Sequence, residues 1–355
     1  MTDSSYKLYG MLMSPYSMKM RAYFRYRRIP FQWINDGRAQ KVAETKVETY
    51  MVPVVEYPDG TFENDSTPII DKLEANIAER STEPENEGDA FLAFLIEDFA
   101  DEWLLWPFFL NRWRTDADTK HNSDWIVSEV FGDTLDADTF EGMSQFWGER
   151  QFIGVEKFCG SPDTYDILDD SLHALLGILE RMVPRRRFFF GSRPSRAEIA
   201  IYGILSQEIQ DLTPSAFMRE NYTFTTRWVS IIDELSGCEG EWEALSTDAD
   251  RLLSSPVAEI LKLSGKYHLP LLQANEEARK KGGKNLSFDI DGRTFERRAH
   301  DRHMPCLPVL KQRYQALAPE SKRALGTLLE VTGCLKYLVT NDSPFDELSG
   351  QALIT

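Results

Sequence analysis

The sequence has few cysteines and no long apolar run. Its 355 residues include four cysteines, Cys159, Cys238, Cys306 and Cys334, and no two of them form a Cys-x-x-Cys pair. Sparse, distant cysteines are typical of ordinary thiols in a reduced compartment and not of a disulfide scaffold. No apolar stretch approaches the roughly 18 to 20 residues of a membrane span. The first residues also lack a charged segment followed by an apolar run, so we expect no signal peptide and a soluble, cytoplasmic protein.

The sequence has fewer basic than acidic residues. The 40 lysines and arginines face 57 acidic residues, which gives a formal net charge of -17. Nucleic acids and anionic membranes bind basic surfaces, so we expect neither as a partner. The run Arg185–Arg187 is short and is interpreted as a solvated helix end. The charge does not exclude a local basic pocket for a small acidic ligand.

A metal site is also not expected. His300, His303 and Cys306 are spaced three apart and could form part of a zinc site. However, no clear fourth ligand is nearby, and Pro305 interrupts any single helix face. A surface turn is the preferred interpretation of this segment.

The chain is long enough for two domains, and its 42% apolar residues allow packed interiors. Residues 1–80 predict the order β-α-β-α-β-β-α. Pro30 ends the first helix, Asp59-Gly60 forms a tight turn between two strands, and Ser66 is the expected N-cap of the last helix. Strands are expected at 6–12, 31–34, 52–57 and 61–63, and helices at 14–29, 36–50 and 66–77.

The rest of the chain is predicted to be mostly helical. A polar, acidic linker is expected at 81–89, a helical domain at 90–240 and an extension at 241–355. The extension is expected to contain a small hairpin near 286–298, because its residues alternate around Asp291-Gly292. Helices are expected at 91–106, 140–158, 164–183, 195–209, 224–235, 256–281, 305–317 and 320–338.

Three segments together resemble the glutathione transferase family. Met13–Arg21 resembles the strand-to-helix corner of its serine-type members. The same segment has the spacing of the Cys-Pro-Tyr-Cys corner of glutaredoxins, with Ser14 and Ser17 at the two cysteine positions. Val52-Pro53-Val54 and Asp65–Ile70 resemble its cis-proline turn and its acid-serine pair. Phe190–Ala200 resembles the family's capping box at the start of a buried helix, with Glu198 in place of aspartate.

The resemblance covers about the first 235 residues, and the tail is similar to that of a less characterised group of long bacterial transferase-like proteins. It implies a thioredoxin-like domain followed by a large helical domain, a homodimer, and glutathione as co-substrate without a metal. Dithiol exchange at positions 14 and 17 is excluded, because serine cannot form the mixed disulfide that exchange requires.

Ser14 is the expected catalytic residue. A glutathione transferase must favour the thiolate, and the Ser14 hydroxyl could donate a hydrogen bond to the sulfur while the helix start adds partial positive charge. Ser17 and Tyr16 are alternatives, because subgroups of the family differ in the hydroxyl that they use. A plain N-cap is the structural alternative for Ser14.

Four residues are expected to hold the tripeptide. The resemblance implies that Val52, before a cis Pro53, pairs through its backbone with the cysteinyl part of glutathione. Ser66 and the amides behind it could bind the γ-glutamyl carboxylate, and Asp65 could pair with its ammonium group. An edge-strand proline and a helix cap are the structural alternatives.

One position departs from the family. Similar serine-type enzymes often have a basic residue just before the Val-Pro pair, where this chain has Thr49-Tyr50-Met51. Arg38, Lys41 or Lys46 could substitute for it in contacting the glycine carboxylate.

The acceptor pocket is expected beside the first long helix of the second domain. Its candidate residues are Trp103, Trp106 and Arg112, with Phe109 and Trp113. Aromatic residues at helical spacing usually pack in the core, which is the alternative for most of them.

The leading hypothesis is therefore a glutathione transferase that acts on a small apolar electrophile. The missing basic residue and the long extension favour a second hypothesis, a transferase-like fold kept as a non-enzymatic binding or regulatory module. A glutathione-dependent isomerase or lyase is the third.

Overall fold

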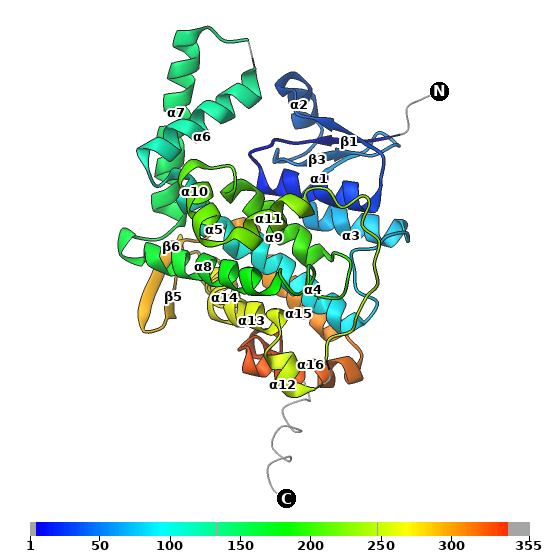
Figure 1. The fold of residues 1–355 in the computed structure, drawn as a ribbon. Helices are drawn as coiled ribbons and strands as arrows, with labels where there is room; N and C mark the ends of the chain where they lie inside the picture. The colour runs from blue at the N-terminus through cyan, green and yellow to red at the C-terminus, as the bar shows by residue number, and fades with distance from the viewer. Residues whose placement is uncertain (1–4, 133, 247, 340–355) are drawn as a thin grey trace, which may run out of the picture. The chain divides into compact units, whose positions relative to one another are not determined.

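The computed structural model describes residues 5–132, 134–246 and 248–339, apart from the side chains of Arg38 and Ala39. The chain separates into two compact units, Met1–Leu245 and Ser246–Thr355. In Figure 1 the first unit runs from blue to yellow-green and the second from yellow to red. Among the described residues, no helix is both long and apolar enough to cross a membrane.

A four-stranded sheet opens the first unit, with the order β2-β1-β3-β4. Strand β1 is parallel to β2 and antiparallel to β3, and β3 is antiparallel to β4. The element order confirms the predicted thioredoxin-like domain. Its elements are β1 (Tyr6–Tyr9), α1 (Pro15–Arg27), β2 (Phe31–Ile34), α2 (Gly37–Glu44), β3 (Val54–Glu56), β4 (Phe62–Asn64) and α3 (Ser66–Asn76).

Two local details differ from the sequence prediction. β1 ends at Tyr9 instead of residue 12, because the backbone amides of Leu12 and Met13 bond to a side chain and not to a neighbouring strand. The N-cap of α3 is Asp65 and not Ser66, since the Asp65 carboxylate accepts the Thr67 amide at 3.3 Å.

The helical part of the first unit contains two helices that the sequence did not predict, α6 and α10, and α4 begins inside the predicted linker. Residues 100–104 form a π-helical turn between α4 and α5. These helices are α4 (Glu87–Phe99), α5 (Leu105–Trp113), α6 (Asp116–Phe131), α7 (Ala137–Phe158), α8 (Tyr165–Met182), α9 (Arg196–Glu208), α10 (Leu212–Asn221) and α11 (Thr223–Ile232), with a short 3₁₀ turn at Pro162–Thr164.

Helix α9 joins the two parts of the first unit by packing along α1. Gly203 permits the close approach, because a Cβ there would lie 2.7 Å from the Pro15 carbonyl oxygen and 2.9 Å from the Lys19 Cβ. The predicted capping box at its start is confirmed. Ser195 caps the helix, and the Glu198 carboxylate accepts the Ser195 amide at 2.8 Å.

The second unit contains the predicted hairpin, whose turn places Asp291 and Gly292 at φ 53° and 78°. Helix α16 ends at Val331, earlier than predicted. Gly333 follows this end with a φ of 75°, a left-handed conformation that is common after helix ends. The segment around His303 forms the expected turn, with Asp301 and Pro305 exposed, although His303 itself is fully buried. The elements are α12 (Ala249–Leu253), α13 (Pro256–Leu263), a π-helical turn (Ser264–His268), α14 (Leu269–Lys280), β5 (Asn285–Ile290), β6 (Arg293–Arg298), a 3₁₀ turn (Asp301–His303), α15 (Cys306–Ala316), α16 (Pro319–Val331) and α17 (Leu335–Leu338).

Candidate functional site

The register of the sheet brings three of the predicted segments to one edge. Tyr9 at the end of β1 is the register partner of Val54 at the start of β3, and Val54 is in turn the partner of Asn64 at the end of β4. The corner after β1, the turn before β3 and the helix start after β4 therefore leave the sheet at the same edge. These segments carry Ser14, Pro53 and Ser66, respectively.

Ser14 is half-buried and caps α1. Its Oγ accepts the Ser17 amide at 3.2 Å, so the hydroxyl hydrogen is left to donate elsewhere. Its two alternatives are placed differently. The Ser17 side chain is fully buried, and the Tyr16 hydroxyl donates to the Asp101 carbonyl at 2.7 Å.

The residues of the other two segments also lie at this edge. The Val52–Pro53 peptide bond is cis, as the resemblance implied. The backbone of Asp65 has φ 76° and ψ 115°, a conformation that non-glycine residues rarely adopt, and its side chain is exposed. Ser66 is buried behind it.

A buried ionic cluster that sequence reasoning missed lies directly beneath Ser66. Lys19 of α1 donates to the Ser66 Oγ at 3.3 Å, and its ammonium lies 2.7 Å from a Glu97 oxygen and 2.6 Å from an Asp101 oxygen. Arg196 pairs with the second Glu97 oxygen. The only signal in the sequence was a lysine between Met18 and Met20, in the apolar part of α1.

The cluster shifts the protonation equilibria of its members. Burial, together with the nearby Glu97, raises the pKa of Asp101 to about 7, although Lys19 acts in the opposite direction. Burial alone would lower the pKa of Lys19, but Asp101 and Glu97 hold it above its ordinary value. Lys19 is therefore charged at neutral pH, beneath the hydroxyl of Ser66.

The residues predicted for an acceptor pocket are mostly in the core. Trp103 is fully buried and donates to the Ser171 hydroxyl at 2.9 Å. Trp106 is 5% exposed and stacks on Phe158 with ring centroids 5.7 Å apart. Arg112 is buried and forms a bidentate pair with Asp211, with distances of 2.8 and 2.9 Å.

The positions considered for the missing basic contact lie around α2 and the loop after it. Met51 is 44% exposed. Lys41 and Lys46 are exposed, and the Lys46 ammonium lies 6.0 Å from the Phe62 ring centroid. The side chain of Arg38 lies outside the described part of the structure.

Residues 8–81 match the family model described as the glutathione S-transferase N-terminal domain. The match covers the thioredoxin-like domain, which is therefore similar to the N-terminal domain of glutathione S-transferases. Among curated proteins, the chain is 23% identical over 249 residues to prostaglandin E synthase 2 of Danio rerio, and the match covers 58% of this chain and 64% of that relative. The chain thus spans less than two thirds of the relative's length.

Two solved structures are among those to which the chain is similar. The β-etherase LigF from Sphingobium sp. strain SYK-6 is 17% identical, with a TM-score of 0.46 and coverage of 66% of this chain and 95% of the other. A glutathione S-transferase of Ceriporiopsis subvermispora, solved in complex with glutathione, is 17% identical, with a TM-score of 0.42 and coverage of 64% and 98%.

The first unit has a cavity of about 360 Å³ at the end of α5. Trp113, one of the aromatic residues considered for the acceptor pocket, lines it together with Leu110, Val155 and Tyr165. The lining is mostly apolar, which suits an apolar ligand.

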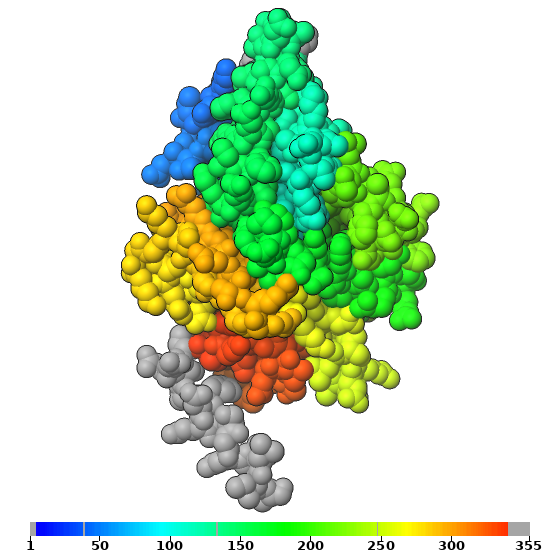
Figure 2. All heavy atoms as spheres, turned by 90° about the vertical axis from the view of Figure 1, so that its left-hand side faces the viewer, coloured from blue at the N-terminus to red at the C-terminus, as the bar shows by residue number. Residues whose placement is uncertain are grey.

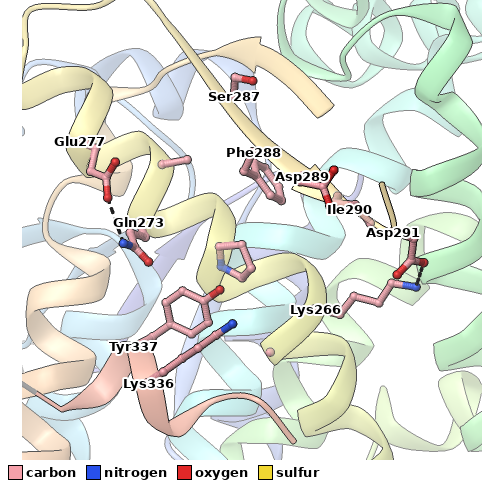
Figure 3. A pocket seen from close by; sticks show the side chains of 13 residues that line it. Lys266, Gln273, Glu277, Ser287, Phe288, Asp289, Ile290, Asp291, Lys336 and Tyr337 are labelled. Atoms are coloured by element: carbon pink, nitrogen blue, oxygen red, sulfur yellow. Dashed lines mark hydrogen bonds and ion pairs between the residues drawn. The ribbon is translucent and has the colours of Figure 1, made fainter. Parts of the chain in front are cut away.

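The second unit has a separate cavity of about 450 Å³ between α14, β5 and α17. Figure 3 shows Tyr337 and Lys336 beside this space, opposite Phe288, and the Lys266–Asp291 ion pair at its side. None of the residues predicted for glutathione lines it. Within the described part of the chain, no group of three or more histidine, cysteine or acidic residues is arranged to hold a metal.

Proposed function

We propose that the chain is a glutathione transferase in which Ser14 stabilises the glutathione thiolate for attack on a small apolar electrophile. The observation that supports this most is the convergence of Ser14, Pro53 and Ser66 at one edge of the sheet, through the pairing of Tyr9, Val54 and Asn64. A tripeptide bound along this edge would place its sulfur at the α1 corner and its γ-glutamyl group at the start of α3.

The hydrogen bonding of Ser14 suits this role. Because its oxygen already accepts the Ser17 amide, the hydroxyl hydrogen can point to a sulfur, and the N-terminus of α1 favours a negative charge. A hydrogen bond to a charged group contributes about 1.5–3 kcal/mol. Lowering a thiol pKa from about 8.5 by about 2 units requires about 2.7 kcal/mol, so one such bond with the helix start is sufficient.

The start of α3 suits the γ-glutamyl group. The Ser66 oxygen accepts from Lys19, which leaves its hydroxyl hydrogen to donate to a carboxylate. The exposed Asp65 carboxylate is held there in a conformation that costs about 1–3 kcal/mol, which is typical of residues at binding sites. We propose that Asp65 binds the ammonium group and Ser66 the carboxylate, while the backbone of Val52 binds the cysteinyl part.

The test compares Ser14→Ala with Ser17→Ala in glutathione binding and in conjugation of a general electrophile. We expect Ser14→Ala to raise the pKa of the bound thiol by about 1–2 units and to lower kcat about 10- to 100-fold at neutral pH. Ser17→Ala, at a fully buried side chain, should change neither. Equal losses in both variants, or unchanged turnover in Ser14→Ala, would contradict the assignment.

A non-enzymatic binding or regulatory module is the second candidate. The exposed Met51, at a place where similar enzymes often have a basic residue, favours it. The same experiment separates the two, because a wild-type protein that does not bind glutathione at all supports the second candidate. Binding without consumption of glutathione would instead point to an isomerase or lyase. The homodimer and the cytoplasmic location stay predictions.

A further inference from the structure

The two residues before Ser14 are held by side chains from three helices. The Glu129 carboxylate of α6 accepts the amides of both Leu12 and Met13, the latter at 3.3 Å. Gln207 of α9 donates to the Leu12 carbonyl at 3.0 Å, and Arg112 of α5 donates to the Met13 carbonyl at 2.8 Å. All four backbone polar atoms of Leu12 and Met13 are therefore bonded to the helical part of the unit.

The end of α6 is itself fixed in place. A Cβ on Gly37, the first residue of α2, would lie 1.9 Å from the Val130 carbonyl oxygen, so the backbones of α2 and α6 are in close contact. Figure 2 shows the α6–α7 pair in green directly beside the blue N-terminal residues. Glu129 thus reaches the corner from a helix end that packs against the thioredoxin-like domain on its other side.

From this arrangement we propose that Glu129 is a positioning residue, which holds the Leu12–Met13 turn so that the Ser14 hydroxyl meets the glutathione sulfur. This rests on the proposed function. A turn outside any sheet ladder has conformational freedom, and each bond to Glu129 removes some of it. A carboxylate suits the task, because its two oxygens accept two neighbouring amides at once.

A blocking role for Glu129 would predict the opposite effect. In that case the carboxylate would occupy amides that the ligand needs, and its removal would raise activity. The bonded amides precede the Ser14 N-cap, whereas the helix amides that favour an anion follow it. This placement favours positioning.

Three variants test the proposal: Glu129→Ala removes both acceptors, Glu129→Gln keeps one, and Glu149→Gln is the matched control. Glu149 is exposed on α7, where Gln145 donates to it at 2.9 Å. Because misplacement of a reacting group by about 1 Å can cost about 100-fold in rate, we expect Glu129→Ala to lower kcat about 10- to 100-fold. Glu129→Gln should fall between it and the wild type, and Glu149→Gln should match the wild type.

Two further readouts separate positioning from a general loss of structure. The thiol pKa of bound glutathione should rise in Glu129→Ala, while the KM for glutathione changes less than threefold, because Asp65 and Ser66 keep their own hydrogen bonds to Thr67 and Lys19. Glu129→Gln has nearly the same shape as the wild type, so it tests the proposal even if Glu129→Ala does not fold.

Hydrogen exchange of the ligand-free protein distinguishes failure of this proposal from failure of the proposed function. The amides of Leu12 and Met13 should exchange at least tenfold faster in Glu129→Ala and faster in Glu129→Gln than in the wild type. Unchanged exchange, an unchanged thiol pKa or a higher kcat in the two variants would overturn the positioning role. If the wild type did not bind glutathione, the proposed function would fail, and faster exchange would show that Glu129 holds the turn while its catalytic purpose is refuted.

Discussion

Replacing Lys19 with methionine should strongly destabilise the first unit. The ammonium of Lys19 lies 2.6 Å from Asp101 and 2.7 Å from Glu97, and all three side chains are almost fully buried. Methionine has a similar length but no charge, so the variant leaves the two carboxylates without this cation. Removing one partner of a buried ion pair costs about 3–5 kcal/mol, and we expect a loss of this size in the free energy of unfolding at pH 7.

The loss should depend on pH in a direction that follows from Asp101. A carboxyl whose folded pKa is raised binds its proton more tightly in the folded state, so its contribution to stability falls as the pH rises from its unfolded value of about 3.9 to its folded value. In the wild type this fall ends near the folded pKa of about 7. Without Lys19 the folded pKa is higher, and the fall continues above pH 7.

The difference in stability between wild type and Lys19→Met should therefore be roughly constant between about pH 5 and pH 6 and grow above pH 7 by up to about 1.4 kcal/mol per pH unit. Urea denaturation at several pH values measures it. Lys120→Met is the matched control, because Lys120 also faces two carboxylates, Asp124 and Glu141, but its side chain is 55% exposed. The control should lose less than about 1 kcal/mol. A loss below about 1 kcal/mol in Lys19→Met, or a loss that does not grow with pH, would refute the buried cluster.

Two further predictions concern packing and thiol reactivity. Gly203→Ala should destabilise the protein by about 1–3 kcal/mol in thermal or urea denaturation, because the new methyl group would clash with the Pro15 carbonyl and with Lys19 of α1. The control Gly142→Ala has open space around its Cβ and should not be destabilised. Equal stability of the two variants would contradict the close packing of α1 and α9. Cys334 should not react with a thiol reagent in the native protein, since burial raises its thiol pKa to about 11. Labelling followed by mass spectrometry should detect modified Cys334 only after unfolding. Cys238 is partly exposed and should be labelled in the native state. Rapid native labelling of Cys334 would contradict its burial.

Much of the fold follows from short stretches of sequence. Ser14-Pro15 marks the start of α1, Asp291-Gly292 marks the hairpin turn, and Ser195 with Glu198 marks the start of α9. Each signal acts within a few residues, through a cap or a turn, so it can be read without knowledge of the rest of the chain. The order of strands and helices in the thioredoxin-like domain could be predicted for the same reason.

Helix α6 could not be predicted in this way. Its first residues, Asp116–Asp124, are almost all polar, so no apolar periodicity marks them. The helix is stabilised instead by its caps and by packing against α5 and α7. The N-cap of α3 was also assigned one residue too late, because serine and aspartate are both good caps and only the backbone decides between them.

The sequence by itself determined where α1 and α9 begin and which segments resemble a glutathione transferase. Only the tertiary structure decided that Lys19 meets Asp101 and that Glu129 meets Leu12, pairs separated by 82 and 117 residues. Contacts over such separations depend on how whole helices pack. A charged residue shows no local pattern that identifies its partner, so these interactions appear only once the chain is folded.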